Sequence, residues 1–286
     1  MMATIAGPAR VRVLLAALLA VPATACVARA STPVPPGTVQ PGIVTPSVVT
    51  PSTVSAGALA ARTGRPTPAT GERSAVTAVR VLGTTRDGRR IVAYRVGDRT
   101  ARRSAVVLST MHGTERDTRH IVTNLRDGAP VRGVEMWLVP TYNPDGYAAH
   151  DRYNSRGVDL NRNFPRRWTR QPHSGRRQAS ERETRIFMRF LDRVDPDRVV
   201  SFHQPLQGVD TSHDKRPAFL RRLSEELRLP MERMDCDGGC HGTMTQWFNS
   251  HHHGFAVTVE LSARPSRHYL AGRGPRGLLR ALGARR

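Results

Sequence analysis

Two segments place histidine or glutamate directly after an apolar run of strand type. His112 and Glu115 follow the run 105–109 and are three residues apart at an expected strand-to-helix turn, so both side chains can reach one point. His203 follows a second such run, 198–202. A lone histidine after a strand is most often structural, and a lone HxxE is a weak signal. Their joint occurrence at strand ends favours a shared site.

A third strand-like run, 255–261, carries Glu260 among apolar residues. Burying a carboxylate there costs on the order of several kcal/mol unless it is paired. Two imidazoles and one carboxylate suit Zn²⁺, and three protein ligands leave its fourth position open. A further carboxylate beside that position can act as a general base. The sequence therefore predicts one zinc ion held by His112, Glu115 and His203, with Glu260 as the base.

A second group of polar residues lies between the first and second histidine segments. The sequence Asn-Pro-Asp-Gly at 143–146 is typical of a turn. The segment 157–165 reads Gly-Val-Asp-Leu-Asn-Arg-Asn-Phe-Pro and sets the amide of Asn161 beside the guanidinium of Arg162. Because an arginine fork matches a carboxylate, this pair suits capture of a substrate carboxylate.

Strand-like and helix-like segments alternate around these residues. The expected strands are 76–82, 90–96, 105–109, 134–139, 198–202 and 255–261, and the expected helices are 115–126, 181–194, 218–227 and 277–282. This alternation predicts an α/β fold with three layers, in which a mostly parallel or mixed twisted sheet carries helices on both faces. Ligands bind beyond the carboxyl ends of the strands in such folds.

The amino-terminal quarter of the chain is expected to lie outside this domain. Residues 1–30 have a basic start, an apolar stretch and the cleavage motif Ala28-Arg29-Ala30, which indicate a signal peptide. A competing interpretation is a lipoprotein signal ending at a lipidated Cys26. Residues 31–72 are rich in Pro, Thr and Ser, as in a flexible linker, so the domain spans 73–286. We expect an exported protein, either secreted or associated with the cell envelope.

The chain is strongly basic. It has 44 Lys and Arg against 23 Asp and Glu, a formal net charge of +21. The signal contains three arginines and no acid, so its removal leaves +18. This charge favours an anionic cell envelope as a partner. No nucleic-acid-binding motif interleaves the arginines with aromatic residues, so we expect no nucleic acid partner.

Only two cysteines, Cys236 and Cys240, lie outside the signal. They flank Asp-Gly-Gly, a sequence that turns tightly. In an oxidising compartment this spacing predicts a short-loop disulfide. A zinc knuckle would need two more ligands nearby, and only His241 is available.

Taken together and in this order, the motifs resemble the zinc carboxypeptidase family. They are HxxE at 112–115, NPDG at 143–146, GVDLNRNFP at 157–165, SxH at 201–203 and the strand-borne Glu260. The resemblance covers nearly all of the chain after the linker. It implies the three zinc ligands and the base named above, Asp159 as the carboxylate that orients His112, Asn161 and Arg162 as the clamp on the substrate carboxylate, and Arg152, with Arg156 as the alternative, as the residue that polarises the scissile carbonyl.

Two departures point to one branch of that family. No tyrosine lies between His203 and Glu260, where digestive members carry a mobile one, and only 87 residues separate Glu115 from His203. In both features the sequence resembles the murein peptide amidases. These enzymes cut the bond between γ-D-glutamate and meso-diaminopimelate. The resemblance implies a peptidoglycan peptide as substrate. The extra amine of diaminopimelate would need a polar partner, for which Asp210, Asp235 and Asp237 are candidates.

These observations support an exported zinc hydrolase that acts on peptidoglycan peptides, and we expect a monomer. The alternatives are a general metallocarboxypeptidase on peptides, a small-molecule deacylase of the aspartoacylase kind, and a non-catalytic protein that binds the cell envelope. The export signal argues against the deacylase, since the enzymes it resembles work inside cells. The filled set of catalytic positions argues against the non-catalytic protein.

Overall fold

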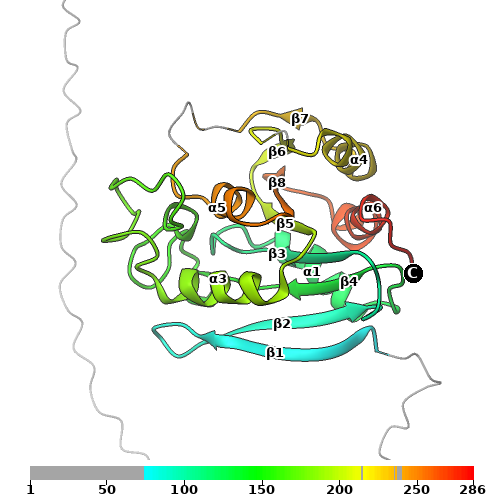
Figure 1. Ribbon diagram of the computed structural model, residues 1–286, viewed down its shortest axis with the longest axis horizontal. Coiled ribbons are helices and arrows are strands. Elements are labelled where there is room, and N and C mark those ends of the chain that lie inside the picture. Colours follow the sequence, from blue (N-terminus) through cyan, green and yellow to red (C-terminus); the bar gives the residue numbers. More distant parts are fainter. Residues whose placement is uncertain (1–73, 214, 235, 237–239) are drawn as a thin grey trace, which may run out of the picture. The chain divides into compact units, whose positions relative to one another are not determined.

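The computed structural model describes residues 74–213, 215–234, 236 and 240–286 and shows an eight-stranded mixed sheet (Figure 1). The strands are β1 (Val76–Thr84), β2 (Arg90–Gly97), β3 (Ser104–Leu108), β4 (Glu135–Val139), β5 (Arg198–His203), β6 (Leu206–Asp210), β7 (Met231–Glu232) and β8 (Phe255–Ser262). Their order across the sheet is β1-β2-β4-β3-β5-β8-β6-β7. The central strands β4, β3, β5 and β8 run parallel to one another, and β2 and β6 flank them antiparallel.

Helices cover both faces of this sheet (Figure 1). They are α1 (Thr118–Asp127), α2 (Pro144–Ala149), α3 (Arg182–Val194), α4 (Pro217–Leu227), α5 (Met244–His251) and α6 (Gly274–Ala281), with a 3₁₀ turn at Leu160–Arg162 and a π-helical turn at Tyr269–Arg273. One core packs α1, α4 and α6 against the sheet, and a second packs α3 and α5. The predicted three-layer α/β fold is confirmed. No helix in the described residues is long and apolar enough to span a membrane.

Central strands are apolar almost throughout because helices cover both of their faces. In β3 and β5 every residue after the first is buried, which is the pattern expected of parallel strands in the interior of a sheet. Strands β3, β5 and β8 are direct neighbours with parallel registers, so their carboxyl ends lie at one edge. In that register His203 lies opposite Glu260.

The predicted helix at 115–126 begins three residues too early. Helix α1 starts at Thr118, because the residues before it form tight turns. The backbone N–H of Glu115 donates to the carbonyl of His112 at 3.1 Å, and the hydroxyl of Thr118 donates to the carbonyl of Glu115 at 2.6 Å. Glu115 therefore belongs to a loop, where its side chain can face His112.

Several sequence predictions concern residues outside the described part of the chain. These are the signal peptide at 1–30 with Cys26, the linker at 31–72, and the candidate amine partners Asp235 and Asp237. They stay predictions.

A candidate metal centre at the carboxyl ends of the strands

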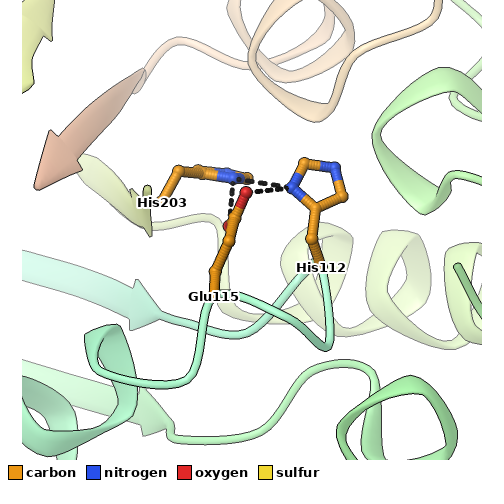
Figure 2. A group of neighbouring side chains, drawn as sticks. All are labelled: His112, Glu115 and His203. Atoms are coloured by element: carbon orange, nitrogen blue, oxygen red, sulfur yellow. Dashed lines mark hydrogen bonds and ion pairs between the residues drawn. The ribbon is translucent and has the colours of Figure 1, made fainter. Parts of the chain in front are cut away.

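Donor atoms of three residues converge at the carboxyl ends of β3 and β5. His112 Nδ1 lies 2.5 Å from Glu115 Oε1, His203 Nδ1 lies 3.0 Å from Glu115 Oε2, and the two Nδ1 atoms are 3.3 Å apart. Figure 2 shows the three side chains directed at one point from the loop after β3 and from the end of β5. All three residues are at least 95 % buried. The structure thus brings the three predicted zinc ligands together.

Each histidine uses its other ring nitrogen for a hydrogen bond. Nε2 of His112 pairs with Asp159 Oδ1 at 3.0 Å, and Nε2 of His203 pairs with Ser201 Oγ at 2.8 Å. Partners of this kind orient metal-binding imidazoles and set their tautomer. With Nε2 engaged in both rings, the two Nδ1 atoms remain to act as ligands at the same point.

The donor set fits a zinc ion. When each ring carries its proton on Nε2, the two Nδ1 atoms, 3.3 Å apart, are both acceptors and repel each other unless a cation lies between them. Apart from the contact with His203 Nδ1, the buried Glu115 Oε2 has no hydrogen-bond partner among the described residues. The donor atoms of His112, Glu115 and His203 all lie within 4.8 Å of one another. Nitrogen and carboxylate donors in this arrangement suit zinc with an open position.

Electrostatics at the centre favour positive charge. Burial disfavours the imidazolium of His112, but Glu115 and Asp159 outweigh burial and raise the pKa of His112 to about 9. Burial alone would raise the pKa of Glu115, yet His203 and His112 lower it to about 2. The pKa of Asp159 also falls well below its usual range despite burial, because His112 and two arginines stabilise its charge. Two carboxylates thus stay ionised around a point that attracts a cation.

Glu260 lines the same cleft, which has a volume of about 410 Å³, without being part of the ligand cluster. Its Oε2 accepts a hydrogen bond from the backbone N–H of Leu206 at 3.3 Å. Burial raises the pKa of Glu260, and the nearby imidazole of His203 partly opposes this rise. A carboxylate that binds protons more readily than usual, next to a metal site, is suited to proton transfer.

Of the two candidate arginines, Arg152 lies in the cleft and Arg156 does not line it. Arg152 donates through Nε and Nη2 to Asp159 Oδ2 at 3.1 and 2.9 Å, and its Nη1 lies 3.8 Å from Glu115 Oε1. Arg156 instead faces Glu181, with 3.5 Å between Nε and Oε2. Asp159 therefore connects the guanidinium of Arg152 to the ring of His112.

Asn161 and Arg162 also line the cleft. The side-chain oxygen of Asn161 accepts from the backbone N–H of Met244 at 3.0 Å, so its amide is held by the start of α5. Arg162 Nη1 donates to the carbonyl of Asn161 at 2.9 Å. Its Nη2 lies 3.6 and 3.8 Å from the sulfur atoms of Cys236 and Cys240.

The two cysteines form the predicted disulfide, with Cα atoms 5.1 Å apart. Both cysteines line the cleft. The disulfide therefore packs directly against the arginine expected to bind the substrate carboxylate.

The segment Asn-Pro-Asp-Gly at 143–146, which the sequence predicted to be a turn, forms the start of α2 and supports the neighbouring loop. Asn143 caps α2 and donates through Nδ2 to the carbonyls of Met111 and Tyr153 at 3.4 and 3.1 Å. A Cβ atom on Gly113 would lie 2.1 Å from the carbonyl carbon of Gly146, so the two loops need glycine to approach this closely. The segment thus supports the loop that carries His112.

Two site residues were missed or left open by sequence reasoning. Ser201 was not assigned a role, although its spacing of two from His203 on one strand puts both side chains on the same face. Asp210 was one candidate among three. The structure places it at the end of β6, lining the cleft and 9 % exposed.

Comparison with known proteins gives consistent matches. Residues 69–272 match the family model described as zinc carboxypeptidase. Two curated proteins named murein peptide amidase A, from Escherichia coli K12 and O157:H7, are 34% identical to the chain over 112 residues. That match covers 33% of this chain and 45% of each relative, so less than half of the relatives' length is matched.

Solved structures show the same fold. The murein-tripeptide amidase of Escherichia coli O157 has a TM-score of 0.60 at 23% identity, covering 71% of this chain and 91% of that one. Carboxypeptidase A of Helicoverpa armigera also has a TM-score of 0.60, at 15% identity, covering 73% of this chain and 69% of that one.

Proposed function

The chain belongs to the zinc carboxypeptidase family, a family of zinc-dependent hydrolases, and from this we propose that it is an exported peptidase that cleaves amide bonds in peptidoglycan peptides. The observation that carries the proposal is the convergence of two imidazoles and a carboxylate on one point, with Glu260 in the same cleft. The relatives named murein peptide amidase support the choice of substrate.

The residues around this point have different roles in hydrolysis. When bound, the zinc ion supplies Lewis-acid polarisation of the scissile carbonyl and makes water more acidic. Glu260 accepts a proton from the attacking water and delivers it to the leaving nitrogen. Arg152, held in place by Asp159, donates hydrogen bonds to the carbonyl oxygen as negative charge develops there. Hydrogen bonds to Leu206 and Asp159 hold Glu260 and Arg152 in place before substrate binds, so these side chains need to move little during the reaction.

The cleft also offers partners for a leaving group with both signs of charge. Asn161 and Arg162 can bind its carboxylate, and Asp210 can bind its ammonium group. Three bonds converge on Asp210 Oδ1, from the backbone N–H and hydroxyl of Ser212 and the backbone N–H of Met234. Asp210 is 9 % exposed and lines the cleft, and a carboxylate in so buried a position favours a cation as its partner. Diaminopimelate carries both groups, so we place it on this side of the scissile bond.

Product analysis tests the proposal. The purified protein is incubated with the tripeptide L-alanyl-γ-D-glutamyl-diaminopimelate, with and without a zinc chelator. Mass spectrometry is expected to show free diaminopimelate only when zinc is available. If ordinary peptides lose their carboxyl-terminal residue while this tripeptide stays intact, the chain is a general metallocarboxypeptidase. If neither substrate is cleaved, the proposed peptidase function is contradicted.

For Asp210→Asn, we predict a loss of preference for a charged leaving group. Tripeptides that end in lysine and in norleucine differ mainly in the ammonium group. Loss of a charge-assisted bond should lower kcat/KM for the lysine substrate about tenfold or more and leave the norleucine substrate nearly unchanged. Steady-state kinetics on both substrates measures the ratio. Asp127→Asn removes an exposed carboxylate on α1 and serves as the control. An unchanged ratio in Asp210→Asn would rule out this role.

A further inference from the structure

A second cavity, with a volume of about 560 Å³, opens at the opposite ends of the central strands. Its lining includes Ser104, the first residue of β3, and Arg198, the first residue of β5. His203 is the last residue of β5, five steps along the strand. At about 3.3 Å per residue this corresponds to roughly 16 Å. The cavity is therefore separate from the metal centre.

Cationic side chains dominate this cavity. The cationic residues in its lining are Arg102, Arg103, Arg198, Lys215, Arg216 and Arg222. Asp197 is the acidic residue in the lining, and its Oδ2 already accepts from the backbone N–H and the hydroxyl of Ser104 at 2.8 and 3.1 Å. Within the described part of the chain, none of the six cations forms an ion pair. The lining thus carries a large excess of positive charge, six cationic residues against one acidic residue.

Arg198 shows the consequence of this crowding. Its guanidinium lies over the ring of Phe219, 4.9 Å from the centroid, and is half-buried. Burial lowers the pKa of Arg198, and repulsion from Arg216, Arg103 and Arg222 lowers it further against the opposing charge of Asp197. Like charges held together in a partly buried place are unfavourable unless an anion joins them.

The amino terminus of α4 adds to the positive potential. Pro217 and Ala218, in the first turn of this 11-residue helix, line the cavity. The turn contains no acidic residue, and the N-cap residue Arg216 makes no side-chain capping bond. An uncapped helix start carries a partial positive charge and favours anions. It acts here together with the cationic lining.

We propose that this cavity binds a ligand that carries two or more phosphate groups. Arginine forks and a helix start match phosphate oxygens, and one phosphate would neutralise only part of the charge of six cations. The ligand is either a free oligophosphate or the phosphate headgroups of an anionic lipid surface. The site is independent of the proposed hydrolysis, because its residues line no part of the cleft that holds His112, Glu115 and His203.

Binding of tripolyphosphate tests the inference. Isothermal titration calorimetry at about physiological ionic strength compares the protein with the double variant Arg216→Gln/Arg222→Gln. Both side chains are exposed, so the fold should tolerate the change. The matched control, Arg86→Gln/Arg90→Gln, removes two exposed arginines at the β1–β2 hairpin. Hydrolytic activity of all three proteins reports correct folding.

One tripolyphosphate should bind per chain, and affinity should fall about tenfold or more in the cavity variant and less than about threefold in the control. A second arm measures sedimentation with phosphatidylglycerol vesicles, using phosphatidylcholine vesicles as the neutral comparison. Vesicle binding that is lost in the cavity variant and displaced by tripolyphosphate would identify the lipid headgroup as the source. No binding to either probe, or equal losses in both double variants, would overturn the inference, because general positive charge would then explain any attraction.

Discussion

Glu260→Gln is expected to lower kcat on the murein tripeptide by about 10²- to 10⁴-fold, the usual contribution of general acid–base catalysis. Glutamine keeps the size of the side chain, and its amide oxygen can still accept from the backbone N–H of Leu206. It cannot accept a proton at neutral pH. Zinc content should stay near one ion per chain, because Glu260 is not among the converging donors. Steady-state kinetics and elemental analysis of one preparation measure both quantities.

A matched variant shows whether the loss is specific to the cleft. Glu135→Gln makes the same chemical change at the start of β4, at the opposite end of the parallel strands, where Glu135 Oε1 lies 3.6 Å from Arg95 Nη1. We expect kcat to stay within about twofold. If Glu260→Gln instead lost its zinc, Glu260 would be a ligand, and its assignment as the base would be wrong.

The metal centre was predictable because its ligands are attached to the most regular part of the fold. The runs that became β3, β5 and β8 are apolar and bounded by polar residues, so both the strands and their carboxyl ends could be located. The rule that ligands bind at those ends then placed His112, His203 and Glu260 together. The strand order that makes the three strands neighbours follows from long-range packing, which the local pattern does not contain.

Irregular segments were harder. The loop between α2 and the 3₁₀ turn has no periodicity, so the sequence alone left Arg152 and Arg156 as alternatives. The structure separates them through Asp159, whose carboxylate receives Arg152 while Arg156 turns to Glu181. That contact depends on the position of the whole loop.

Strand β6 was not predicted, and its sequence explains why. The run Leu206-Gln-Gly-Val-Asp210 is short and contains a glycine and an aspartate, residue types that are depleted in strands. Pairing with β8 overrides these local preferences. The same pairing brings Asp210 to the cleft. Because the sequence did not predict β6, it also could not select Asp210 from the three candidate partners for the amine.

His203→Ala should abolish zinc binding and reduce hydrolysis to background. The variant removes one of three donors and leaves His112 and Glu115, which cannot hold the ion in the same geometry. In the unchanged protein, bound zinc stabilises the native state by about 4 kcal/mol when its free concentration is about 1,000 times the dissociation constant. A chelator should therefore lower Tm by several degrees in the unchanged protein and have no effect on the variant. Differential scanning calorimetry with and without chelator measures this difference.

The comparison with chelator distinguishes loss of the ligand from loss of the fold. An unfolded variant would show no cooperative transition, whereas a folded variant without zinc should melt near the Tm of the chelated protein. His120→Ala removes an exposed imidazole from α1 and should keep both the zinc and the chelator-dependent shift. If His203→Ala retained one zinc ion per chain, the ion would be held elsewhere. The converging donors at the ends of β3 and β5 would then have no role in hydrolysis, and the proposed function would lose its main support.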